Sequence, residues 1–200
     1  MRRRFTAVIA VVAVAAACVS WWPAEACVGK TIFVGRLPGR EQEVLTEMFS
    51  WMVSERTGTT IQMKTFSDSR TTHAALQTAD IDLYLEDQGV AAREILGRQV
   101  SGSATEAREM LRREYEQRFN LVWLEPWGMT GHAVGAATAP TLVAPVIRKD
   151  TLKKFPALSR LVNKLSGVVD DATLARLVQE SEKRPSREVV KQFLKEKRLI

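Results

Sequence analysis

The sequence predicts an α/β fold: a three-layer sandwich with a mainly parallel sheet of about five strands, followed by C-terminal helices. The first observation is the order of elements, because short apolar runs alternate with helical patterns as far as residue 85. Alternating strands and helices are typical of a parallel sheet covered by helices on both faces. The second observation is size, because about 170 residues after a predicted signal peptide are enough for one core but not for two.

The first half of the chain predicts three strands with helices between them. The helix after the first strand is well defined, because its apolar residues recur every three or four positions and Gly58 ends it. The next helix starts at a cap, either Asp68 or Ser69, and ends at Gln77. The predicted strands are residues 31–34, 59–64 and 81–85, and the first helix is 40–56.

The second half of the chain predicts two more strands and further helices. Ser103 and Glu106 form a capping box for a charged helix that ends at Phe119. The segment from Gly131 to Pro140 is almost entirely Gly, Ala, Thr and Val, which predicts a crossover loop. The predicted strands are 121–124 and 141–147, and the other helices are 90–96, 151–165, 171–183 and 186–198.

The first 26 residues predict a signal peptide. Three arginines precede an apolar stretch, 5–19, which is too short for a membrane span, and Ala24-Glu25-Ala26 fits the small-x-small cleavage pattern. We therefore expect export to the periplasm, with residues 27–200 forming a single domain. The alternative is a lipid anchor on Cys27 or Cys18.

Composition argues against several classes of function. Removal of the signal peptide lowers the net charge from +6 to +4, and the basic excess lies mostly in the final helices, where it indicates a solvated face rather than a nucleic-acid surface. Cys27 is then the last cysteine, which precludes an internal disulfide. His73 and His132 lack the spacing of a zinc site, and we find no nucleophile elbow, phosphate loop or dinucleotide fingerprint. We therefore expect no enzyme activity, no metal and no cofactor.

Four blocks of sequence carry a family resemblance. In chain order they are Val34-Gly35 with Glu41-Gln42 and Glu47-Met48; Ser67-Asp68-Ser69 with Ile81-Asp82-Leu83-Tyr84; Asn120-Leu121 with Trp123-Leu124-Glu125-Pro126; and Ala144-Pro145-Val146-Ile147. Together they resemble the substrate-binding proteins of glycine betaine, choline and osmoprotectant ABC transporters, which have the type II periplasmic-binding-protein fold. The resemblance implies capture of a small cationic or zwitterionic solute and its delivery to an ABC permease in the inner membrane.

The resemblance also implies a second lobe that this chain lacks. Members of that family have two lobes joined by crossover strands, whereas here the chain passes from Gly128 almost directly to Ala144. Residues 129–143 are therefore predicted to be a shortened crossover, at the point where a second lobe would be inserted. A single lobe offers an open half-site, and its uncovered face invites a partner chain or a homodimer.

A second departure from the family is chemical. The resemblance places a tyrosine of an aromatic cage where this chain has Asp87, and glycines where it has Ser67 and Asp68. Recognition of a quaternary ammonium requires ring faces around the cation, which an aspartate does not supply. We expect Trp123 and Trp127 to pack in the core and at its rim, with room for Trp127 to stay exposed, rather than to form a cage.

Six residues are candidate ligand contacts: Glu41, Gln42, Ser69, Tyr84, Glu86 and Asp87. They fall where predicted strands end and helices begin, which is where open α/β folds bind their ligands. Most of them have a structural alternative, such as a place in the first turn of a helix or in its cap. The acidic cluster of Asp82, Glu86 and Asp87 is either a cation site or a set of solvated capping residues.

Two functions follow from these patterns. The favoured one is an exported solute-binding component, or a degenerate relative of one, of an ABC transporter for glycine betaine, choline or a similar quaternary ammonium osmoprotectant. The other is a single-lobe module that associates with itself or with a partner and no longer binds the family ligand.

Overall fold

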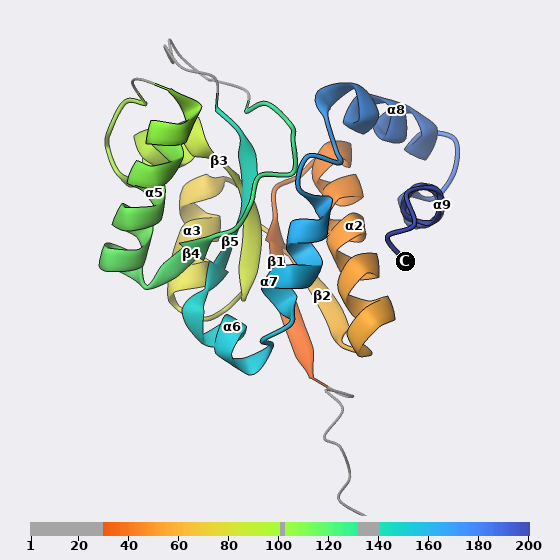
Figure 1. The fold of residues 1–200 in the computed structure, drawn as a ribbon, viewed down its shortest axis with the longest axis horizontal. Helices are drawn as coiled ribbons and strands as arrows, with labels where there is room; N and C mark the ends of the chain where they lie inside the picture. Colours follow the sequence, from red (N-terminus) through yellow and green to blue (C-terminus); the bar gives the residue numbers. More distant parts are fainter. Residues whose placement is uncertain (1–29, 101–102, 132–140) are drawn as a thin grey trace, which may run out of the picture.

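The computed structural model describes residues 30–100, 103–131 and 141–200, and these residues form one five-stranded sheet flanked by helices (Figure 1). The strand order across the sheet is β2-β1-β3-β5-β4. This confirms the predicted α/β class and the predicted number of strands. The strands are β1 Thr31–Arg36, β2 Thr60–Thr65, β3 Leu83–Asp87, β4 Leu121–Trp123 and β5 Val143–Arg148.

The direction of β5 corrects the expectation of a mainly parallel sheet. β1 pairs in parallel with β2 and with β3, as the β-α-β-α-β pattern predicts, but β5 is antiparallel to both of its neighbours. The chain turns back after β4, and the Gly131 amide donates to the Thr141 carbonyl at 2.7 Å. A strand that returns directly, without a crossover over the sheet face, must run antiparallel.

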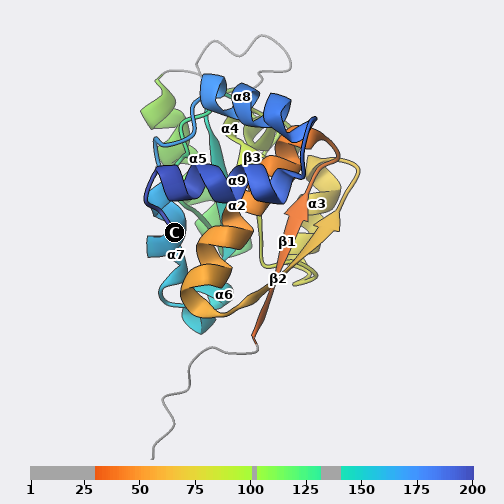
Figure 2. The same cartoon turned by 90° about the vertical axis from the view of Figure 1, so that its right-hand side faces the viewer.

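Helices cover both faces of the sheet (Figures 1 and 2). One face packs against the long first helix and the C-terminal helices, which contact one another. The opposite face packs against two helices from the middle of the chain. The first group is α2 Arg40–Thr57, α7 Leu158–Val162, α8 Asp171–Ser181 and α9 Ser186–Glu196, and the second is α3 Ser69–Gln77 and α5 Ala104–Phe119.

Helix boundaries follow local signals in the sequence. Gly58 ends α2 in the left-handed conformation, with φ of 65°, as the sequence predicts. The predicted capping box of Ser103 and Glu106 is present at the start of α5. The helix expected at 151–165 is wrong, because Pro156 interrupts it. It is replaced by α6 Lys149–Lys154, α7 and the short 3₁₀ helix η2 Asn163–Leu165.

The third strand lies two residues later than predicted, and this moves its acidic end. The Asp82 carboxylate accepts a hydrogen bond from the Phe33 amide at 2.9 Å and another from the Thr151 hydroxyl at 2.8 Å, so it fixes the start of β3. The strand then continues through Glu86 to Asp87. Asp82 therefore lies at the opposite end of β3 from Glu86 and Asp87, and the three carboxylates do not converge.

A short helical segment follows β3 directly. It consists of α4 Gln88–Val90 and the π-helix η1 Ala91–Ile95, where a short helix was predicted at 90–96. Among the described residues, no helix combines the length and apolar character needed to cross a bilayer. The predicted signal peptide, Cys18 and Cys27, and the middle of the predicted crossover, residues 132–140, lie outside the described residues.

Candidate functional site

A cavity of about 230 Å³ lies at the edge of the sheet where β1 and β3 end. It is walled by the residue after β1, the start of α2, the end of β3, α4, the chain after β4, the first residue of β5 and the start of α8. Its apolar lining residues are Leu37, Leu45, Leu85, Val90, Met129, Val143 and Leu174, and its polar ones are Glu41, Gln42, Glu86, Asp87, Thr130 and Asp171.

The polar part of this lining is acidic. It contains four carboxyl groups, those of Glu41, Glu86, Asp87 and Asp171, together with one amide side chain and one hydroxyl. The described residues contribute no lysine, arginine or aromatic ring to the wall. Ionised carboxylates accept hydrogen bonds and attract positive charge, so the electrostatics of the cavity suit a cation.

Glu86 is the most deeply placed of these carboxyl groups. Its residue surface is 4% exposed, and it accepts hydrogen bonds from the Ser69 hydroxyl and, at 3.0 Å, from the Asp87 amide. Burial raises its pKa from 4.5 to about 7, and these hydrogen bonds, with one from Tyr84, moderate the rise. The solvated capping role considered for Glu86 is wrong, because this side chain is neither solvated nor a cap.

Ser69 and Tyr84 lie behind Glu86 rather than in the cavity wall. Ser69 is the buried first residue of α3, and its hydroxyl donates to Glu86. The Tyr84 hydroxyl lies 3.3 Å from Nδ1 of His73, and burial raises the Tyr84 pKa well above 10. Both residues are placed to orient Glu86, and neither lines the cavity.

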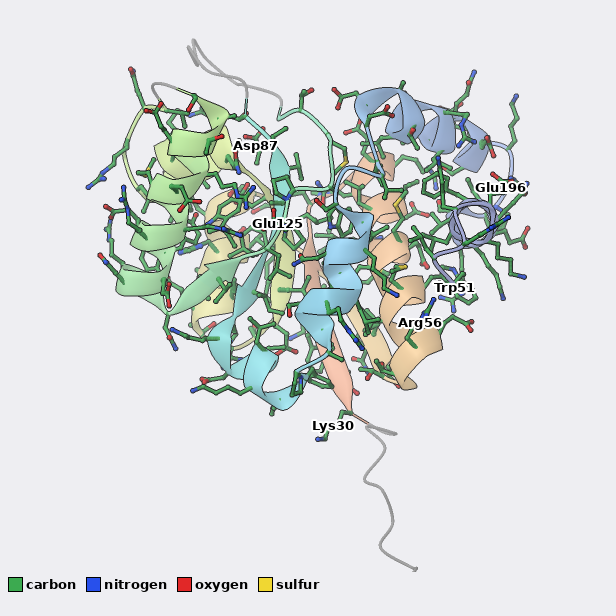
Figure 3. All side chains as sticks on the ribbon, viewed as in Figure 1. Lys30, Trp51, Arg56, Asp87, Glu125 and Glu196 are labelled. Atoms are coloured by element: carbon green, nitrogen blue, oxygen red, sulfur yellow. The ribbon has the colours of Figure 1, made fainter. Side chains whose placement is uncertain are left out.

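Asp87 combines a structural role with a place in the wall. Its carboxylate accepts hydrogen bonds from the amides of Gly89 at 2.6 Å and Val90 at 3.3 Å, which caps α4. Gly131 packs against the same carboxylate so closely that a Cβ there would clash with Asp87 and Thr141. The predicted capping role of Asp87 is confirmed, and the same residue also lines the cavity. Figure 3 labels Asp87.

Glu41 and Gln42 reach the cavity from the first turn of α2. Within the described residues, neither side chain has a hydrogen-bond or ion-pair partner, although the Gln42 carbonyl accepts from Thr46. The helix starts there because Gly39, with φ of 122°, turns the chain away from β1. Both side chains are therefore free to contact a ligand.

Asp171 is a lining residue that the sequence did not single out. It is the first residue of α8, and its carboxylate accepts hydrogen bonds from the amide and the hydroxyl of Thr130. These bonds hold the arm after β4 against α8. A pair of aspartates, Asp170 and Asp171, at a helix start was the available signal, but nothing local connects it to the end of β3.

Trp123, Trp127 and His73 lie outside the cavity wall. Trp123 and Trp127 are buried, with 2% and 0% of their surface exposed, so the expectation that Trp127 has room to stay exposed is wrong. His73 packs edge-on against the rings of Tyr115 and Phe119, and burial lowers its pKa to about 4. Among the described residues, no group of three His, Cys, Asp or Glu is arranged to hold a metal ion.

The fold is similar to those of solved substrate-binding proteins. A structure described as a glycine betaine/carnitine/choline ABC transporter superposes with a TM-score of 0.77 at 12% identity, covering 85% of this chain and 98% of the other. Apo YehZ from Escherichia coli gives 0.69 at 14% identity, covering 85% and 99%. Lactococcal OpuAC in its closed form with glycine betaine gives 0.52 at 9% identity, covering 84% and 96%.

Sequence comparison identifies the family. A search of curated proteins finds no match to this chain. In contrast, the model of the OpuAC family, described as the substrate binding domain of ABC-type glycine betaine transport systems, matches residues 30–139 and 132–196. The matched segments span nearly all of the described structure, including the four blocks of the resemblance. The chain therefore belongs to the OpuAC family of ABC-transporter substrate-binding domains.

Proposed function

We propose that this chain is the exported solute-binding component of an ABC transporter, and that it captures a small cationic or zwitterionic solute in the cavity at the end of β3. The observation that supports this most directly is the gathering of Glu41, Glu86 and Asp87 in one cavity wall. Glu41 comes from α2, whereas Glu86 and Asp87 come from β3, and the topology brings the two elements together at the edge of the sheet where α/β folds bind ligands. Glycine betaine, choline and carnitine are the first solutes to test, because they are named for the structural relatives.

The proposed mode of capture is one-sided. Between Gly131 and Thr141 the chain has room for nine residues, far too few for a second α/β lobe. The solute would therefore contact one wall, and the other side would be closed by the permease, by a second copy of the chain or by solvent. A one-sided site buries less of its ligand than a closed cleft, so we expect weak affinity and fast release.

Titration calorimetry of the mature chain with glycine betaine, choline and carnitine tests the proposal. We expect a saturable heat with at least one of these solutes or with another small cation, and weaker binding in Glu41→Gln. The matched control is Glu116→Gln, which removes a carboxylate from the exposed end of α5, where it pairs with Lys149. Light scattering on the same samples reports self-association. A stable dimer that binds none of these solutes would contradict the proposal and support the interaction module.

A further inference from the structure

We infer that the solute is a cation that carries N–H groups, such as a primary ammonium or a guanidinium, and not a quaternary ammonium. This inference rests on the proposed function and concerns the same cavity. It follows from the groups in the cavity wall, which offer hydrogen-bond acceptors and, among the described residues, no aromatic ring.

The first step is the absence of an aromatic cage. A quaternary ammonium has no N–H group, so it is held mainly by the faces of aromatic rings. The described residues contribute no ring to the cavity wall. The nearby aromatic side chains do not reach the cavity. Trp127 is fully buried in the apolar core, and Tyr84 lies behind Glu86. The sequence of residues 132–140 contains no Phe, Tyr or Trp.

The second step is the supply of hydrogen-bond acceptors. Glu41 and Gln42 have no side-chain partner within the described residues, so their oxygens are available to a donor. Glu86 accepts hydrogen bonds from Ser69, Tyr84 and the Asp87 amide, and an ionised carboxylate has about four acceptor positions. An N–H cation satisfies such acceptors with charge-assisted hydrogen bonds, whereas a trimethylammonium group would leave them unpaired.

The third step is size and charge. The cavity volume of about 230 Å³ lies below the range of about 300–1,000 Å³ that is typical of sites for drug-sized ligands. The described wall carries carboxyl groups and no basic side chain to balance them. A compact ligand with net positive charge therefore fits the wall better than a neutral ligand of the same size.

Ethanolamine and choline are a matched pair for this test, because they differ only in the three N-methyl groups. Calorimetric titrations of the mature chain at pH 8 and low ionic strength, where Glu86 is mainly ionised, would compare ethanolamine, N,N-dimethylethanolamine and choline. We expect ethanolamine to bind at least tenfold more tightly than choline, with the dimethyl compound between them. We also expect Glu41→Gln to weaken ethanolamine binding at least fivefold, and the control Glu116→Gln to leave it unchanged.

The outcomes separate the inference from the proposed function. Choline binding as tightly as ethanolamine, or more tightly, would overturn the inference and leave the proposed function standing. Absence of binding by all three compounds and also by glycine betaine, carnitine and guanidinium would overturn both. Ethanolamine binding that Glu41→Gln does not weaken would place the ligand elsewhere and overturn the inference.

Discussion

The two faces of the central sheet use the same strands in different ways. On the face toward α2, α8 and α9, the side chains of β3 are Leu83 and Leu85, and they join a large apolar cluster. On the face toward α3 and α5, the side chains of β3 are Tyr84 and Glu86, and polar groups lie within the packing. Because successive side chains of a strand point to opposite faces, one five-residue strand contributes to both environments.

The difference between the faces assigns them different roles. The apolar face contains Phe49, Met48 and Trp127, each at most 1% exposed, and it provides most of the hydrophobic stabilisation. The other face carries a buried carboxyl and a buried imidazole, whose protonation depends on pH. The cavity lies where the two faces meet at the end of β3, with Leu85 from one and Glu86 from the other. Substitutions in the apolar core that do not line the cavity, such as those at Phe49, can therefore test stability without touching the site.

Truncation of the apolar face should have the largest effect on stability. Phe49→Ala removes a ring that is 1% exposed, and we expect it to lower the free energy of unfolding by about 3–5 kcal/mol. Phe49→Leu is the matched control, and it should cost clearly less because it keeps most of the buried volume. Urea denaturation followed by circular dichroism measures both. A loss below about 1 kcal/mol for Phe49→Ala would show that this face is not the main core.

Glu86→Gln should change how stability depends on pH. The carboxyl of Glu86 has a raised pKa in the folded state, about 7 against 4.5, so the folded protein retains a proton that the unfolded chain releases. The Glu86 carboxyl therefore contributes fully to the unfolding free energy below pH 4.5, and this contribution is lost as pH rises toward and above 7. The wild type should lose roughly 3 kcal/mol relative to Glu86→Gln between pH 4.5 and pH 8.

His73, the buried imidazole on the same face, makes stability depend on pH in the opposite direction. Burial lowers the pKa of His73 to about 4, so its contribution is lost as pH falls through the acidic range. His73 is present in both the wild type and Glu86→Gln, so its effect cancels in the difference between their urea curves at each pH. A difference that stays constant from pH 4.5 to pH 8 would contradict the environment described for Glu86.

A comparison of two helix caps separates structure from binding. Asp68 caps α3 and lies outside the cavity wall, whereas Asp87 caps α4 and lines the cavity. Removal of either cap by substitution with alanine should lower the unfolding free energy, because amides at the start of the helix lose their acceptor. Only Asp87→Ala should also weaken cation binding, as measured by calorimetry. Equal effects of the two substitutions on binding would remove Asp87 from the site.

Surface ion pairs should have the smallest effect. Lys149 and Glu116 are joined at 2.7 Å, but their side chains are 42% and 57% exposed. Lys149→Ala should therefore change the unfolding free energy by less than about 0.5 kcal/mol, and by less again in high salt. Thermal unfolding with and without 1 M sodium chloride tests this. A larger loss of unfolding free energy would mean that this ion pair stabilises the fold more than an exposed pair is expected to.

Local patterns in the sequence were sufficient to predict most elements of the fold. Helical spacing predicted α2, and a capping box predicted α5, because these signals lie within a few residues of one another. The antiparallel direction of β5 was not predictable in this way, since it depends on the path of the connection after β4 rather than on the strand itself. The break at Pro156 follows from the inability of proline to continue a helix, a rule that the prediction of one continuous helix over 151–165 did not apply.

The candidate site was predictable only in part. Glu41, Gln42, Glu86 and Asp87 were expected at the ends of strands and the starts of helices, and the structure places all four in one cavity wall. Sequence alone did not distinguish the wall from what lies behind it, because burial of Ser69 and Tyr84 depends on how α3 packs on the sheet. Asp171 was missed because it approaches the cavity from a helix distant in sequence.

The pKa of the Glu86 carboxyl, measured by carbon-13 NMR with and without saturating ethanolamine, tests the central claim most directly. The signal is assigned by its loss in Glu86→Gln. A cation bound at the end of β3 favours the ionised carboxylate, so we expect a pKa of about 7 in the free protein and a clearly lower value in the complex. A pKa near 4.5 in the free protein, or one that ethanolamine at saturation leaves unchanged, would contradict a cation site built on Glu86.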